Sequence, residues 1–194
     1  MVSNLSIFAQ NSEMATKKEQ KLKVILDELR SDDIKKAAKA IKSLEEYGDA
    51  SVIKPLFALL KEGLPAKLEA EVLELLCSLK DTSVVVEFME VLEDEEMLEI
   101  RPMVLTSIWN MKVDFSAYID DFVLIATTGS FLEALDCLTI IENLEGPFME
   151  EDILEAQLHL KDFLENGDRS DGQKMEILSE IAILLKEINM NLMD

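Results

Sequence analysis

The chain has 194 residues, and its 40 Asp+Glu outnumber 19 Lys+Arg to give a formal net charge of −21. Apolar residues make up 48% of the chain, which is a globular proportion, and the length suits one domain or one short repeat array. The 6 Gly and 4 Pro are too few for the many tight turns of a β-sandwich or barrel. The negative charge opposes binding to nucleic-acid phosphates, so an acidic, mostly helical protein that binds no nucleic acid is expected.

Apolar side chains recur at steps of three and four residues from about residue 13 onward, which is the spacing of amphipathic helices. Ser31, Asp32 and Asp33 are candidate caps for the second helix, and Gly48 can end it. We expect residues 1–12 to be a disordered N-terminus and residues 13–194 to form a single domain. The predicted helices cover about residues 21–30, 34–47, 51–62, 65–79, 83–94, 97–111, 115–127, 131–144, 148–166 and 174–191.

Two neighbouring helix pairs have similar sequences. The turn at residues 49–52 aligns with the turn at residues 81–84, which places Leu44 on Leu76. One pair cannot bury its apolar face alone, so a helix pair that recurs in this way is typical of an α-solenoid.

The first of these pairs, around Ile41–Gly63, contains the pattern A-I-x-x-L-x-x-Y-G-D-x-x-x-I-x-P-L-x-x-L-L and resembles the consensus of HEAT repeats. Residues 73–92 carry a weaker copy, and the later units lack the Gly-Asp turn and the proline. The resemblance covers residues 31–166. It implies an all-α, right-handed α-solenoid of about four to five antiparallel helix pairs, with an N-terminal helix and a C-terminal capping helix. HEAT proteins are generally scaffolds and binding modules, so the resemblance implies that kind of function.

Side chains for metal or covalent chemistry are scarce. His159 is the only histidine, and neither cysteine lies in a CxxC spacing, so multi-histidine and thiolate metal sites have no support. The polar loop at residues 166–172 does not match the EF-hand ligand spacing. Glu87, Glu90 and Glu93 share one helix face, but a solvated face explains them more simply than a catalytic carboxylate pair. We predict no catalytic residue, metal or cofactor, and a protein that is not an enzyme.

The apolar segments argue for a cytoplasmic protein without membrane contact. No uncharged stretch approaches the roughly 20 residues that span a bilayer, and residues 1–12 lack the features of a signal peptide. Cys77 and Cys137 sit in apolar helical patterns, so we expect buried thiols in a reducing compartment. Trp109 is most simply a core residue. An exposed tryptophan would instead be an anchor for a partner.

Charge is unevenly distributed along the chain. Residues 1–61 hold 11 Lys+Arg and 9 Asp+Glu, a net charge of +2, whereas residues 62–194 hold 8 and 31, a net charge of −23. Surface composition alone is the plain explanation. The alternatives are that one end meets the opposite end of a second copy, or that a basic partner lies along the acidic part.

In solenoids of stacked pairs, the second helix of each pair usually lines the concave side, and here these helices are about 51–62, 83–94, 115–127 and 148–166. We expect a non-enzymatic protein–protein interaction or scaffold module that binds a basic peptide or protein surface in an acidic concave groove. The alternative is a self-assembling structural protein, a homodimer formed through an end helix or through opposite-charge ends. The candidate partner-binding residues are Glu87, Glu90, Tyr118, Asp121, Glu151 and Glu155.

Overall fold

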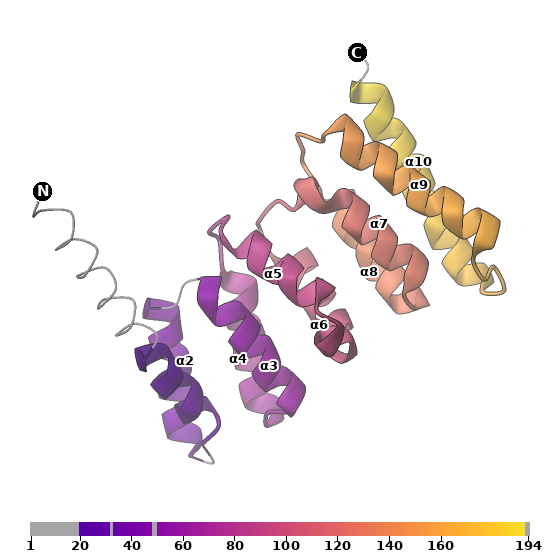
Figure 1. The fold of residues 1–194 in the computed structure, drawn as a ribbon. Coiled ribbons are helices and arrows are strands. Elements are labelled where there is room, and N and C mark those ends of the chain that lie inside the picture. Colours follow the sequence, from indigo (N-terminus) through magenta and orange to yellow (C-terminus); the bar gives the residue numbers. More distant parts are fainter. Residues whose placement is uncertain (1–19, 32, 48–49, 193–194) are drawn as a thin grey trace, which may run out of the picture. The chain divides into compact units, whose positions relative to one another are not determined.

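The computed structural model describes residues 20–31, 33–47 and 50–192, and in these ranges the chain consists of helices and short connections without a strand (Figure 1). The all-α prediction is confirmed for this part of the chain. The disorder predicted for residues 1–12 and the helix end predicted at Gly48 lie outside the described residues. The chain divides into two compact units, Met1–Ser78 and Leu79–Asp194. The single domain expected for residues 13–194 stays a prediction.

In the first unit, a cap and a glycine mark helix boundaries. Asp33 caps the helix that follows it, as predicted, because its Oδ1 accepts hydrogen bonds from the backbone N–H groups of Lys35 and Lys36 at 3.0 and 3.4 Å. The helix before residue 63 ends where Gly63 adopts a φ of 93°, which glycine tolerates without strain. The elements are a helix at residues 20–29, α2 (Ile34–Tyr47), the 3-10 turn η1 (Ala50–Val52), α3 (Ile53–Glu62) and α4 (Ala66–Ser78).

Apolar packing and one ion pair hold the first unit together. α4 packs against both α2 and α3. The core includes Leu29, Ala37, Phe57 and Val72, all essentially inaccessible to solvent. At the surface, the guanidinium of Arg30 donates two hydrogen bonds to the carboxylate of Glu62, at 3.1 and 3.2 Å, and so joins the end of the first described helix to the end of α3.

In the second unit the predicted helices are present, but two of them begin in a 3-10 turn. η2 (Glu95–Ile100) precedes α6 and η3 (Ser116–Tyr118) precedes α7. Pro102 lies in the first turn of α6, where a missing N–H costs nothing. The α-helices are α5 (Val84–Glu93), α6 (Arg101–Asn110), α7 (Ile119–Thr128), α8 (Phe131–Glu142), α9 (Glu150–Asn166) and α10 (Gly172–Leu192).

Helices of the second unit pack both with their chain neighbours and in alternation (Figure 1). α5 packs on α6, α7 on α8, and α9 on α10, while α8 also contacts α6 and α10, and α7 also contacts α9. Phe115 connects α5 to α7, because its ring packs edge-on against Phe88 and Phe122, each with ring centroids 6.3 Å apart. α6, α8 and α10 therefore follow one another in one row, and α7 and α9 are adjacent in another.

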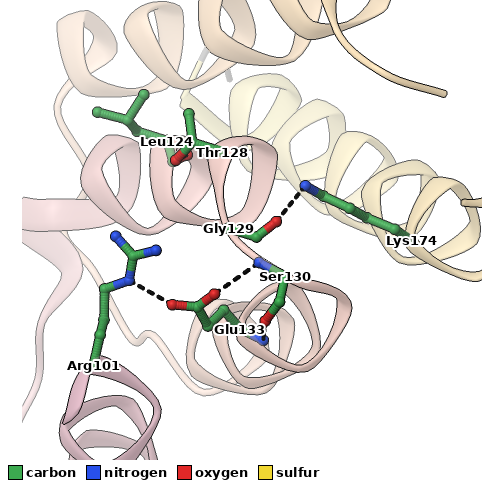
Figure 2. Close-up of polar contacts among 7 residues, drawn as sticks. All are labelled: Arg101, Leu124, Thr128, Gly129, Ser130, Glu133 and Lys174. Atoms are coloured by element: carbon green, nitrogen blue, oxygen red, sulfur yellow. Dashed lines mark hydrogen bonds and ion pairs between the residues drawn. The ribbon is translucent and has the colours of Figure 1, made fainter. Parts of the chain in front are cut away.

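Polar contacts from four helices hold the corner between α7 and α8 (Figure 2). Ser130 caps α8: its Oγ accepts a hydrogen bond from the Glu133 N–H at 3.3 Å, and the Glu133 carboxylate accepts one from the Ser130 N–H at 2.7 Å. The same carboxylate binds the guanidinium of Arg101 on α6 at 2.5 Å. Lys174 on α10 donates to the carbonyl oxygen of Gly129 at 2.6 Å. Arg101 thus ties the start of α8 to α6, and Lys174 ties the end of α7 to α10.

Glu133 is charged at this corner although it is buried. Burial by itself would raise the pKa of the Glu133 carboxyl, but the hydrogen bonds from Arg101 and Ser130 together outweigh burial and hold that pKa below its usual value. The corner is also too tight for a side chain at Gly129. A Cβ there would lie 2.8 Å from the carbonyl oxygen of Ile125 and 2.9 Å from Oε2 of Glu133.

Two expectations about single side chains need correction. Trp109 is not in the core: 41% of its surface is exposed, because it lies near the end of α6 on the side shared with the exposed Thr106. Neither cysteine forms a disulfide; Cys137 is buried as expected, but Cys77 is only partly buried. The cytoplasmic location inferred from them stays a prediction. Among the described residues, no helix combines the length and the apolarity that a bilayer crossing requires.

Candidate functional site

Acidic side chains from three helices converge on Asp121 in the first turn of α7. Its carboxyl group is about half-buried, and its pKa is raised from 3.8 to about 6. Burial is the main cause, and the negative charges of Asp120, of Glu93 at the end of α5, and of Glu155 and Asp152 on α9 add to it. These five residues form what we call the acidic cluster.

The acidic cluster has no compensating cation among the described residues. None of its five side chains takes part in an ion pair or a side-chain hydrogen bond there, and the ion pairs that do form lie elsewhere. The pKa of Asp152 is also raised, by burial and by the charge of Asp120. The whole second unit carries 27 Asp+Glu and 7 Lys+Arg, a net charge of −20. Negative potential therefore accumulates around Asp121.

Two of the six candidate residues, Asp121 and Glu155, are brought together in this cluster. The other four lie on the same or adjoining elements, but none of them contributes to the raised pKa of Asp121. A direct role for those four in binding stays a prediction. Their positions are Glu87 and Glu90 on α5, Tyr118 in η3, and Glu151 in the first turn of α9.

Three members of the cluster were not selected from the sequence. Glu93 follows the candidate Glu90 by one helical turn, and Asp152 precedes the candidate Glu155 by one turn. Asp120 directly precedes a candidate. A search one helical turn before and after each candidate residue could have found Glu93 and Asp152. It could not have shown which carboxylates from different helices meet.

A recess of about 420 Å³ opens beside the acidic cluster, between α7, the second half of α9 and the start of α10. Asp121 lies near Glu155 on α9. One turn further along α7, Leu124 lines the recess together with His159, which is one turn beyond Glu155. Leu124 is 39% exposed, and Phe163 adds a second apolar side chain to the wall. α7 and α9 thus run in the same direction and share one surface that holds both features.

Groups for metal or nucleophilic chemistry are not assembled in the part of the chain that the structure describes. No set of three or more His, Cys, Asp or Glu side chains there could hold a metal ion. Burial raises the pKa of the Cys137 thiol, which keeps it protonated and unreactive.

Comparison with protein-family models, with curated proteins and with solved structures finds no significant match to this chain. The findings show an all-helical protein without an identified family. The likeness to HEAT repeats therefore remains a resemblance of sequence pattern.

Proposed function

We propose that the chain is a non-enzymatic binding module that takes a basic peptide or a basic protein surface on the face formed by α5, α7 and α9. The observation that supports this proposal is the acidic cluster. Its five carboxylates come from three helices, and none of them forms an ion pair with a cation of the described residues. A fold that only needed solubility could spread these charges apart. Keeping them together around the half-buried Asp121 raises the free energy of the unbound protein, and a cationic partner would relieve that cost.

Charge would act mainly on the encounter with the partner, and contact with apolar groups would add affinity. A net charge of −20 in the second unit attracts a basic segment from a distance and raises the association rate at low salt. Leu124, exposed one turn from Asp121, offers an apolar contact within the same surface. Rim charges govern association rates more than affinity, so the apolar contact would chiefly slow dissociation.

The same proposal includes the finer architecture, a right-handed HEAT-like α-solenoid of about four to five antiparallel helix pairs. Its support is the packing order of the second unit, in which α8 contacts α6 and α10 while α7 contacts α9. Stacked helix pairs give this pattern, because each helix meets its own partner and the equivalent helix of the next pair. The contacts pair α5 with α6, α7 with α8 and α9 with α10, so α5, α7 and α9 are the first helices of their pairs and not the second helices that the sequence predicted for the concave side.

A peptide with regularly spaced arginines tests the proposed function. A fluorescein-labelled (Arg-Gly-Gly)4 peptide is titrated with the full-length protein, and binding is followed by fluorescence anisotropy at 50 mM and 500 mM NaCl. A cluster variant carries Asp121→Asn, Asp152→Asn and Glu155→Gln. The matched control carries Glu176→Gln, Glu180→Gln and Glu187→Gln, which removes three charges from exposed positions of α10.

We expect the cluster variant to bind about tenfold more weakly at 50 mM NaCl, since three lost charge contacts of roughly 0.5 kcal/mol each sum to about 1.5 kcal/mol. The control should lose about twofold through the general field alone. Affinity should fall at 500 mM NaCl, where charges are screened within about 5 Å. Equal losses in the two variants, or no binding of the peptide, would refute the proposal.

A second candidate is self-association through the last helix pair. Leu154 and Leu158 lie one turn apart on α9 and are 57% and 54% exposed, and α10 exposes Ile183 and Met190. Large apolar side chains that stay exposed on one element often mark a contact with another chain. α9 already packs on α7 and α10, so these leucines occupy the side that a further helix would cover.

A further inference from the structure

We propose that the recess beside Leu124 takes the guanidinium group of an arginine side chain from the basic partner; this inference rests on the proposed function and assigns its specificity pocket. The recess has the volume for one long side chain, about 420 Å³. It lies on the same side of α7 as the acidic cluster, so one bound segment can reach both.

Carboxylates in the wall of the recess select a cation. Asp162 comes from α9, Asp168 from the following loop, and Asp171 from the position before α10. Each accepts local hydrogen bonds on one oxygen, Oδ1. The donor is the Asn166 amide for Asp162, the Ser170 N–H for Asp168, and the first N–H groups of α10 for Asp171. Within the described residues no hydrogen bond is made by the second oxygen of Asp162 or of Asp171, whereas the Asp168 carboxylate also interacts with the Ser170 side chain. Only one cation, Lys174, lines the recess with them.

Lys174 does not neutralise the recess fully, because its ammonium group is directed to backbone oxygens. Its Nζ donates to the carbonyl oxygen of Gly129 at 2.6 Å (Figure 2). It also donates to the carbonyl oxygen of Thr127 at 2.8 Å and lies 5.2 Å from the ring centre of Phe163. The C-terminal end of α7 therefore already holds one cationic group at this place, as the helix dipole favours. Three aspartates against one lysine leave a net negative charge for a second cation.

The spread of acceptors favours arginine over lysine. Carboxylates on three different segments suit a planar group with five N–H donors better than a compact ammonium. The apolar wall formed by Leu124 and Phe163 can cover the three methylene groups of an arginine stem.

The distance between the recess and the acidic cluster sets a spacing for the partner. Asp121 marks the acidic cluster on α7, and Thr128 on the same helix lines the recess. The two residues are seven positions apart, which is about 10 Å at roughly 1.5 Å per residue. Three residues of extended chain cover the same distance at about 3.3 Å each. An extended segment with basic residues three positions apart thus places one arginine in the recess and the next at the cluster.

The experiment compares (Arg-Gly-Gly)4 with (Lys-Gly-Gly)4, which carry equal charge at equal spacing. Both are titrated by anisotropy at 50 mM NaCl into the unmodified protein, the cluster variant, the α10 control, and a recess variant with Asp162→Asn, Asp168→Asn and Asp171→Asn. Asparagine keeps the Oδ1 hydrogen bonds and remains a good helix cap, so the recess variant should fold. Circular dichroism checks that it does.

We expect the unmodified protein and the α10 control to prefer the arginine peptide about fivefold, in line with one charge-assisted hydrogen-bonded contact. The recess variant should bind both peptides equally, whereas the cluster variant should weaken both and keep the preference. If the recess variant keeps the arginine preference, or the unmodified protein shows none, the inference fails, and the proposed function stands as long as the cluster variant still binds more weakly than the control. If neither peptide binds, both fail.

Discussion

Asp121 shows at the scale of one residue how the acidic cluster opposes folding. Its carboxyl pKa in the folded protein, about 6, lies above the ordinary value of 3.8, because burial and four negative neighbours disfavour the carboxylate. Between these two pH values the folded state binds more protons than the unfolded state. The contribution of Asp121 to stability is therefore favourable in acid, and it is lost as pH rises from about 4 through 6.

Replacement of Asp121 by asparagine should stabilise the protein at neutral pH. The shift corresponds to about 3 kcal/mol, and solvent screening of a half-exposed group reduces this to about 1–2 kcal/mol. Urea unfolding followed by circular dichroism should show this gain at pH 7.5 and almost none at pH 4. Glu176→Gln, at an exposed position of α10, serves as the control with a smaller effect. A loss of stability in Asp121→Asn at pH 7.5 would contradict the described environment.

Sequence reasoning reached part of the cluster for a clear physical reason. Helical spacing within α7 and α9 selected Asp121 and Glu155, since residues on one face of a helix follow from their separation. It gave no information on the influence of Glu93 on the pKa of Asp121, because that influence depends on where α5 lies relative to α7. Trp109 was misplaced for a related reason: an apolar residue near a helix end can lie on either side, and only the neighbouring helix decides.

At the scale of elements, helix existence followed from the sequence better than helix boundaries did. The apolar stripes of α5 and α8 are continuous and were recognised, whereas the turns η2 and η3 were assigned to the helices that follow them. Stripes identify α-helix by its period, but a single 3-10 turn is too short to show a period of its own. The corner around Glu133 was not anticipated either, because Arg101 and Lys174 reach it from distant parts of the chain.

Glu133→Gln should lower the free energy of unfolding by about 2–3 kcal/mol at pH 7, because it leaves the partly buried Arg101 without its anionic partner. The pKa of Glu133 in the folded protein is below its usual value. The stability that the Glu133 carboxylate contributes is therefore fully present at pH values above the usual pKa, and it is lost as pH falls through the lower pKa of the folded protein. Chemical denaturation from pH 7 to pH 3 should show the difference between the two proteins shrinking. Glu142→Gln, at the exposed end of the same helix, should change stability by less than about 0.5 kcal/mol. A Glu133→Gln protein as stable as the unmodified one would show that the corner is dispensable.

At the scale of the whole molecule, the two units differ strongly in net charge. The first unit has 12 Lys+Arg and 13 Asp+Glu, a net charge of −1, against −20 in the second. The sequence predicted this asymmetry directly, since charge counts need no knowledge of packing. It left open whether the acidic part binds another protein or a second copy of the chain.

Sedimentation velocity across a wide concentration range distinguishes these two uses. If the exposed leucines of α9 form a dimer contact, the unmodified protein should dimerise at about 100 µM, and Leu158→Glu should keep it monomeric by placing a charge in the contact. Leu132→Glu, at a 63% exposed position of α8, is the control that should not change the mass. Dimerisation that disappears in 500 mM NaCl would instead indicate pairing of opposite-charge ends, and a monomer under all conditions would exclude self-association.

Cys137 gives the folded protein a latent chemical reporter. The thiol sits inside α8 with no exposed surface, and its pKa is raised by burial, so alkylating reagents have neither access nor a thiolate to attack. Cys77, in the first unit, is only partly buried. Once Cys77 is blocked under native conditions, each later alkylation event records one opening of the second unit. A ligand that stabilises that unit can therefore be detected as a slower rate of modification, even when its own identity is unknown.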